Sequence, residues 1–212
     1  MRNITALGLA LVAALAFGAV LASAASANEF TAEAESVEVT ADQTEEGQHV
    51  FSVEGSEVKC NTAHFATEGE VAAPAESLEV HPEYGGCTAF GFVGSTIDTE
   101  GCNYVLNAGS TKTSGDTYDG NIDLICSESA VIKVTAGTCE AQIGSQEGLT
   151  EIMYTNLTGS GEVEVEANVT GIAVNKTKDG FLCPLSGTGE ATGTYTGDTV
   201  ASGVGGVGIA VE

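Results

Sequence analysis

The chain has 212 residues, with 30 Asp and Glu against 6 Lys and Arg, and its formal net charge is −24 at pH 7. This charge excludes nucleic acid as a natural partner, because neutralising phosphates requires clustered Lys or Arg. Anionic membrane surfaces are excluded as partners for the same reason. An acidic surface of this kind keeps a protein dispersed by self-repulsion and attracts cations.

The first 27 residues have the features of a secretory signal peptide. Arg2 supplies the positive charge, a largely apolar stretch follows, and Ala25-Ser26-Ala27 provides a small-residue cleavage site. We expect cleavage between Ala27 and Asn28, with Ala22-Ser23-Ala24 as an alternative site. The sequence therefore predicts export, with the mature protein secreted, either extracellular or at the cell surface.

Residues 28–212 are long enough to form one exported domain with a proper core, and no linker-like segment divides them. Residues 28–57 carry nine acidic residues and no Lys. This stretch is therefore either a loosely held acidic arm or a solvated edge of the same domain, and the sequence leaves both interpretations open.

Alternation of polar and apolar residues dominates the mature chain and predicts strands with one solvated face. In the clearest run, 162–170, every even position is polar and every odd position is apolar. In chain order we expect strands at 36–40, 49–54, 57–60, 77–80, 88–92, 95–98, 102–106, 122–126, 131–135, 139–143, 151–156, 162–170, 171–175, 190–195 and 207–211. The expected fold is all-β, an antiparallel β-sandwich or barrel of many short strands.

Gly-rich clusters separate these runs and predict the turns. They lie at Tyr84-Gly85-Gly86, Thr99-Glu100-Gly101, Asn107-Ala108-Gly109-Ser110, Asp119-Gly120-Asn121 and Lys178-Asp179-Gly180.

All six cysteines lie in the mature chain and predict three disulfides in an exported protein: Cys60, Cys87, Cys102, Cys126, Cys139 and Cys183. No Cys-x-x-Cys pair occurs, so no zinc site is expected. A hairpin joining Cys87 to Cys102 would have its midpoint between Gly94 and Ser95, where the chain can turn. The spacing therefore favours the pair Cys87–Cys102 and leaves the other pairings open.

The segments around these cysteines resemble a family of uncharacterised exported, cysteine-containing, β-rich proteins of soil actinobacteria. The resemblance spans roughly residues 57–195 and implies export, disulfides and a Gram-positive source, but no activity, ligand or site residue. The segments that carry it are Gly86-Cys87-Thr88-Ala89-Phe90-Gly91, Gly101-Cys102-Asn103-Tyr104, Thr135-Ala136-Gly137-Thr138-Cys139-Glu140 and Lys178-Asp179-Gly180-Phe181-Leu182-Cys183-Pro184, followed by Gly187-Thr188-Gly189-Glu190.

No catalytic, cofactor or metal site is predicted by motif. The Gly-x-Gly-x-x-Gly match at 203–208 has no room for the helix and acidic residue that dinucleotide binding requires, and no Gly-x-Ser-x-Gly occurs. His49, His64 and His81 stand in ordinary strand or turn contexts.

Calcium is the strongest chemical alternative. Four residues with oxygen-bearing side chains fall within eight positions around Gly120, namely Asp116, Asp119, Asn121 and Asp123. The EF-hand pattern fails here, however, because its sixth position is Leu124 and its twelfth is Ala130. An Asp-Gly-Asn hairpin turn explains the same residues.

These observations favour a non-enzymatic, exported, disulfide-stabilised acidic β-domain with an envelope-associated or extracellular structural role. The alternative is an extracellular binding module for a carbohydrate, a cell-wall polymer or a protein partner. A concave face bearing Tyr84, Tyr118 or Tyr154 would favour that alternative. A secreted hydrolase is the third hypothesis.

Overall fold

The computed structural model describes residues 28–44, 48–180, 183–185 and 187–212, so the predicted signal peptide through Ala27 lies outside the described residues. The described residues form 18 strands and one short 3-10 helix. In chain order these are β1 (Phe30–Ala32), β2 (Ser36–Val37), β3 (Val39–Gln43), β4 (His49–Val53), β5 (Ser56–Cys60), β6 (Thr62–Ala66), β7 (Val71–Ala72), β8 (Ser77–Gly85), β9 (Thr88–Ala89), β10 (Val93–Asp98), β11 (Cys102–Ser114), β12 (Thr117–Cys126), β13 (Ile132–Ala136), β14 (Cys139–Ile143), β15 (Gln146–Leu157), β16 (Glu162–Asp179), β17 (Gly189–Gly203), η1 (Val204–Gly206) and β18 (Ile209–Val211).

The predicted all-β antiparallel fold is confirmed, and its main sheet closes on itself as a barrel. Many strands are short, as predicted, but two are longer than expected, since β16 has 18 residues and β17 has 15. The strands expected at 162–170 and 171–175 are one strand. Gly171 has φ of +75° at a register shift in the pairing with β17, so a bulge joins the two segments without ending the strand.

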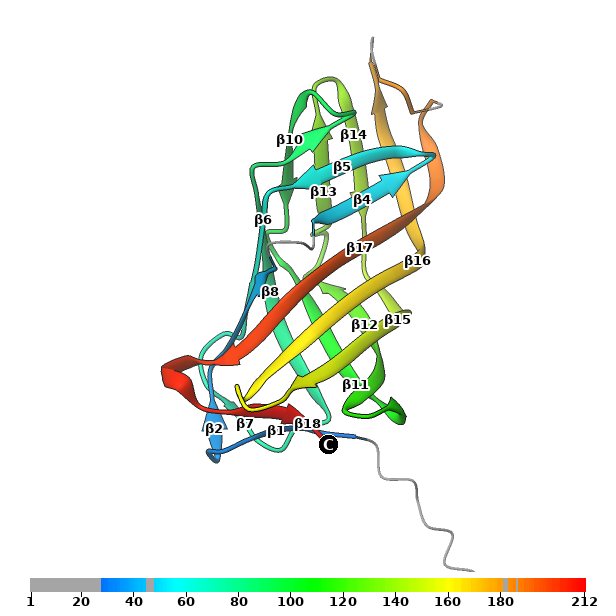
Figure 1. Ribbon diagram of the computed structural model, residues 1–212. Coiled ribbons are helices and arrows are strands. Elements are labelled where there is room, and N and C mark those ends of the chain that lie inside the picture. Colours follow the sequence, from blue (N-terminus) through cyan, green and yellow to red (C-terminus); the bar gives the residue numbers. More distant parts are fainter. Residues whose placement is uncertain (1–27, 45–47, 181–182, 186) are drawn as a thin grey trace, which may run out of the picture.

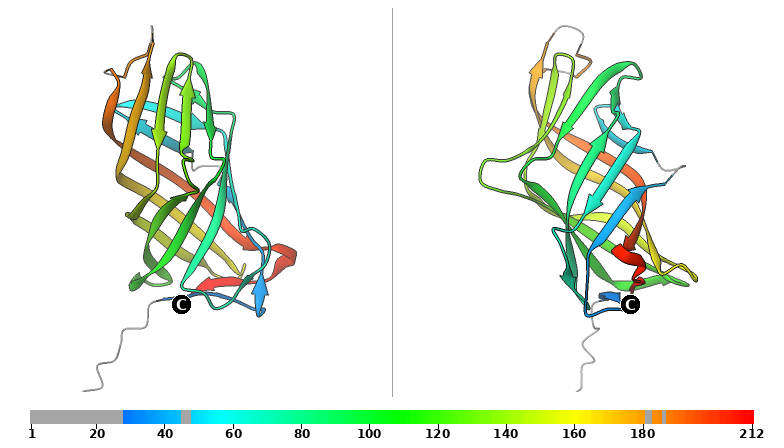
Figure 2. Two further views of the ribbon diagram at one scale, coloured as in Figure 1. Left: turned by 180° about the vertical axis from the view of Figure 1, so that it is seen from behind. Right: turned by 90° about the vertical axis from the view of Figure 1, so that its left-hand side faces the viewer.

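The long hairpin of β16 and β17 divides the closed sheet into two barrels. Residues 162–169 of β16 belong to a circuit of eight strands, β16-β15-β12-β11-β8-β6-β3-β17. Residues 172–179 belong to a second circuit of eight, β16-β14-β13-β10-β9-β5-β4-β17. We call these the lower barrel and the upper barrel, after their places in Figure 1. The views in Figure 2 show the same stacking from two other sides.

Two small sheets lie at the lower end of the lower barrel, where β1 pairs with β18 and β2 pairs with β7 (Figure 1). The side-chain amide of Asn156 holds β18 in place, because it donates to the carbonyl of Val211 and accepts from the Val211 amide, both at 2.8 Å. Residues 28–57 contribute β1 to β4 and the first residues of β5. Backbone pairing of these strands favours the second interpretation of this stretch, an edge of the same domain.

Alternation along the strands separates the acidic exterior from the apolar interior, as the sequence predicted. In β8, for example, Leu78 and Val80 are buried while Glu79 and His81 are exposed. Figure 1 shows this strand along one wall of the lower barrel. The interior of each barrel is therefore built from every second residue of its strands.

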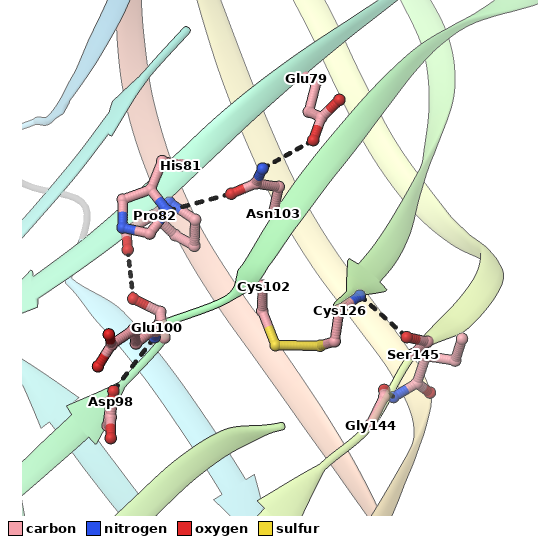
Figure 3. Close-up of a disulfide and its surroundings, with 12 residues drawn as sticks. Glu79, His81, Pro82, Asp98, Glu100, Cys102, Asn103, Cys126, Gly144 and Ser145 are labelled. Carbon is pink, nitrogen blue, oxygen red and sulfur yellow. Dashed lines mark hydrogen bonds between the residues drawn. A yellow bond between two sulfur atoms is a disulfide. The ribbon is translucent and has the colours of Figure 1, made fainter. Parts of the chain in front are cut away.

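All six cysteines form disulfides, as predicted, but the expected pair Cys87–Cys102 is wrong. The pairs are Cys60–Cys87, Cys102–Cys126 and Cys139–Cys183. The segment after Cys87 does not fold back to Cys102, because β9 pairs with β5 and so places Cys87 near Cys60. Cys102 instead lies opposite Cys126 in the β11–β12 hairpin (Figure 3).

The three disulfides indicate an oxidising, extracellular environment. In the described part of the chain, no helix has the length and hydropathy needed to cross a membrane.

Candidate functional site

The interior of the lower barrel contains a cavity of about 80 Å³. Inward-facing residues from strands all around the barrel and from the β1–β18 sheet line it, and they are almost all apolar, among them Phe30, Val39, Leu78, Leu106, Val163 and Ala201. The corresponding space in the upper barrel, between Phe51, Phe90 and Leu185, is about 30 Å³. The lower barrel therefore holds the larger interior space of the two.

Tyr154 stands at the lower end of this cavity. Its ring packs edge to face against Phe30 of β1, with 5.2 Å between ring centroids. The same ring lies across Gly120, where a Cβ atom would come within 2.2 Å of it. Tyr154 is fully buried, yet its hydroxyl has no hydrogen-bond partner within the described residues. An unpaired hydroxyl in such a place costs about 1–3 kcal/mol of desolvation.

A cluster of aromatic side chains forms the opposite end of the cavity, where the two barrels meet. Its members are His49, Phe65, Tyr84, Tyr104 and Tyr195, with ring centroids 5.6 to 6.3 Å apart. They come from β4, β6, β8, β11 and β17, strands far apart in the sequence. Four of the five line the cavity directly, and Tyr84 packs behind them.

Hydrogen bonds connect the polar atoms of this cluster. The hydroxyl of Tyr84 donates to that of Tyr195 and also bonds that of Tyr104, each at 3.1 Å. The hydroxyl of Tyr195 in turn contacts Nδ1 of His49. Burial raises the pKa of all three tyrosines above its usual value, so each keeps its proton at neutral pH.

His49 is the one titratable cationic group among the described residues that line the cavity. It is 3% exposed, and burial lowers its pKa from 6.5 to about 4, with the backbone carbonyl of Asp198 offsetting part of the effect. The imidazole is therefore neutral at pH 7. Its Nε2 atom is buried and, among the described residues, has no hydrogen-bond partner.

The cavity therefore has a largely apolar lining, with polar side chains among the residues at both of its ends. Three buried polar side-chain atoms of the described residues lack a partner, and two of them belong to cavity-lining residues, His49 and Tyr154. Buried polar groups without partners are rare in proteins and require an explanation. Binding of a molecule with its own polar group would supply one.

The four residues considered for calcium do not lie together as a calcium site would require. Asp116 lies in the β11–β12 turn and pairs with Lys112, while the other three lie on the outer face of β12. Asp119 accepts from the Thr111 amide, and Asn121 and Asp123 both accept from the side chain of Asn107. Across the described residues, no group of three or more His, Cys, Asp or Glu side chains is placed to hold a metal ion.

The turn expected at Asp119-Gly120-Asn121 is wrong, because these residues lie inside β12 and the hairpin turns at Gly115 and Asp116. The ring of Tyr154, which packs against Gly120, explains why a glycine occupies this position. Gly120 faces the interior, and a side chain at that position would occupy the space that Tyr154 fills.

The other two histidines lie on the outside of the lower barrel. His64 bonds Asp42 at 2.7 Å, and His81 donates to Asn103, whose amide donates to Glu79 (Figure 3). These exposed side chains form hydrogen bonds with one another between neighbouring strands. Of the tyrosines considered for a concave binding face, Tyr118 and Tyr154 are buried.

Sequence reasoning missed His49 and Tyr195 as site residues, although the alternation contained a signal, and it considered Tyr154 only for a concave binding face. His49 shares its strand face with Phe51 and Val53, which places a polar ring on an apolar face. Tyr195 stands between Gly193 and Gly197 on the inner face of β17, and small residues beside a large one leave interior space.

No family model, curated protein or solved structure matches this chain. The resemblance to exported actinobacterial proteins stays a prediction, and the site is interpreted from its geometry.

Proposed function

We propose that the protein is an exported, non-enzymatic binding protein that holds a small, mostly apolar molecule inside the lower barrel. The observation that carries this proposal is the apolar cavity of about 80 Å³ inside the lower barrel. Two of the residues that line it have buried polar atoms without a partner in the described part of the chain. The three disulfides support a function outside the cell.

Energetics favour an occupied cavity. At roughly 24 cal/mol per Å³, an empty space of this size costs about 2 kcal/mol of stability. Each unpaired polar atom adds about 1–3 kcal/mol. These costs are large beside a typical folding stability of about 5–15 kcal/mol. A bound molecule would offset both, which supports a binding role over the purely structural role that the sequence favoured.

The same residues argue against the other hypotheses. A carbohydrate module needs exposed aromatic platforms, whereas Tyr118 and Tyr154 are buried and the Tyr84 hydroxyl is bonded to two other tyrosines. Acid–base hydrolysis uses groups whose pKa values lie near neutral pH. The described residues that line the cavity include His49, three tyrosines whose pKa values burial raises, and no carboxylate. A lining of this kind suits a protein that binds its ligand without catalysing a reaction.

Ligand-observed saturation-transfer NMR on the oxidised protein, with ethylbenzene as the probe, tests the proposal. We expect saturable binding to the wild type and loss of binding in Ala201→Leu, whose larger side chain projects into the cavity. Ala173→Leu is the matched control, because Ala173 is exposed on β16.

The absence of saturable binding to the wild type would overturn the proposed function. Equal binding by the wild type and Ala201→Leu would also overturn it, because the probe would then sit outside the lower barrel. A circular dichroism spectrum and a melting curve of each variant separate loss of binding from loss of folding.

A further inference from the structure

Charged side chains are distributed unevenly between the outside and the inside of the protein. The sequence has 30 Asp and Glu and a net charge of −24, yet the described residues that line the lower-barrel cavity include no Asp, Glu, Lys or Arg. Alternation along the strands produces this separation. Val163 and Val165 of β16 line the cavity, for example, and Glu164 between them lies on the outer face.

The lysines that could neutralise an anionic ligand lie away from the cavity. Lys176 is 4% exposed, but it pairs with Glu54 at 2.6 Å and belongs to the part of β16 that forms the upper barrel. Lys178, farther along the same strand, pairs with Glu140. A carboxylate or sulfonate inside the lower barrel would therefore have no cation beside it among the described lining residues.

The titratable side chains of the lining are themselves uncharged near neutral pH. Burial lowers the pKa of His49 to about 4 and raises the pKa values of Tyr104, Tyr154 and Tyr195. The lining therefore keeps the same charge, zero, from about pH 5 to about pH 9. A change of binding within this range reports the charge of the ligand.

We propose that the lower barrel binds uncharged molecules only, and takes weak acids and weak bases in their neutral forms. This inference rests on the proposed function and specifies the chemical class of its ligand. Hydrocarbons, phenols, esters and alcohols belong to that class, whereas carboxylates, sulfonates and ammonium ions do not.

The size of the discrimination follows from desolvation. Moving an ionised group from water into an apolar interior without a counter-ion costs far more free energy than moving a neutral polar group. We therefore expect the charged form of a molecule to bind at least about a hundredfold more weakly than a neutral molecule of the same shape.

Cations are a special case, because the outer surface attracts them while the cavity rejects them. The net charge of −24 concentrates cations around the protein. In about 1 M NaCl this surface attraction is screened within about 3 Å, whereas an apolar interior is little affected by salt. Competition at high salt therefore measures the cavity alone.

Two pairs of probes with matched shapes test the inference. Benzylammonium has the shape of ethylbenzene, and benzoate has the shape of nitrobenzene, so each pair differs in charge. In competition NMR on the oxidised wild type at pH 7 and about 1 M NaCl, nitrobenzene should displace ethylbenzene. Benzoate and benzylammonium should displace none at concentrations about a hundredfold higher.

A second readout follows the protonation of one probe. 4-Nitrophenol loses its proton near neutral pH, and its anion absorbs visible light. If only the neutral form enters the cavity, excess wild type should raise the apparent pKa of the probe. Ala201→Leu, which has the same surface charge and a filled cavity, should leave this pKa unchanged.

The outcomes separate the inference from the proposed function. Displacement of ethylbenzene by benzoate or benzylammonium as readily as by nitrobenzene would overturn the inference and leave the proposed function standing. So would a 4-nitrophenol that displaces ethylbenzene with its pKa unchanged. Exclusion of nitrobenzene together with benzoate would also overturn the inference, because polarity and not charge would then decide. Failure of ethylbenzene to bind would overturn both.

Discussion

The hydroxyl of Tyr195 contacts Nδ1 of His49, and this contact joins β17 to β4 where the two barrels meet. His49 lines the lower-barrel cavity, and its Nε2 atom is buried without a hydrogen-bond partner among the described residues. At the other end of the cavity, the buried hydroxyl of Tyr154 also has no partner among those residues. Burying such polar atoms without partners lowers the stability of the ligand-free protein.

Replacing Tyr154 with phenylalanine is expected to stabilise the ligand-free protein. The hydroxyl is buried without a partner among the described residues, so its removal should raise the free energy of unfolding by about 1 kcal/mol. Tyr104→Phe is the control, because the Tyr104 hydroxyl bonds that of Tyr84 and its loss should lower stability. Urea denaturation measures both variants, and destabilisation by Tyr154→Phe would contradict the assignment of an unpaired hydroxyl.

Gly120→Ala is expected to destabilise the lower barrel by about 1–3 kcal/mol, the usual cost of overpacking. Its Cβ atom would lie 2.2 Å from Cε2 of Tyr154 and 2.7 Å from the carbonyl oxygen of Asn107. Gly94→Ala is the matched control in a strand of the upper barrel, with nothing within 4 Å of its Cβ atom. Thermal melts compare the two, and equal effects would show that Tyr154 does not lie over Gly120.

The buried His49 makes stability depend on pH. The imidazole of His49 has a pKa near 6.5 in the unfolded chain, whereas burial lowers this pKa to about 4 in the folded protein. Stability attributable to this group is therefore complete above pH 6.5 and is lost as the pH falls toward 4, by about 3 kcal/mol in all. His49→Gln should remove this loss.

His81→Gln removes an exposed histidine and serves as the control for this pH dependence. The free energy of unfolding is measured by denaturant titration from pH 4 to 7 for each variant and the wild type. The same slope for His49→Gln and wild type would show that His49 binds its proton equally in the folded and unfolded states.

Free thiols in two double variants report the disulfide pairs. Cys87→Ala/Cys102→Ala should expose the thiols of Cys60 and Cys126, whereas Cys102→Ala/Cys126→Ala should expose none. Alkylation followed by mass spectrometry counts them. The second variant should also lose about 3 kcal/mol of stability, because its bridge closes a loop with a sequence separation of 24. Absence of free thiols in the first variant would contradict the pairing.

Much of the strand pattern could be predicted because each strand has one solvated face. The alternation at 162–170 indicated the inner and outer residues of β16 correctly. β6 (Thr62–Ala66) was missed, although its first four residues, Thr-Ala-His-Phe, alternate between polar and apolar. The glycine at position 120 was assigned to a turn because local preference favours turns, whereas the ring of Tyr154, far away in sequence, explains it.

The cavity and the disulfides depend on which strands are neighbours, and local patterns carry little of that information. The midpoint between Cys102 and Cys126 falls at Ser114, directly before Gly115, so the hairpin argument applied to this pair would have found it. The partners of His49 come from β17 and β8, and no spacing in the sequence brings those strands together. The site could therefore be recognised only from the closed sheet, which brings these strands together.

A crystal structure of the oxidised protein with ethylbenzene tests the central claim most directly, because it shows where the molecule lies. The proposed function predicts the ring of the molecule inside the lower barrel, between Phe30 and His49. Ethylbenzene bound only on the outer surface, or a lower barrel whose side chains close over the space and leave no molecule inside, would contradict it.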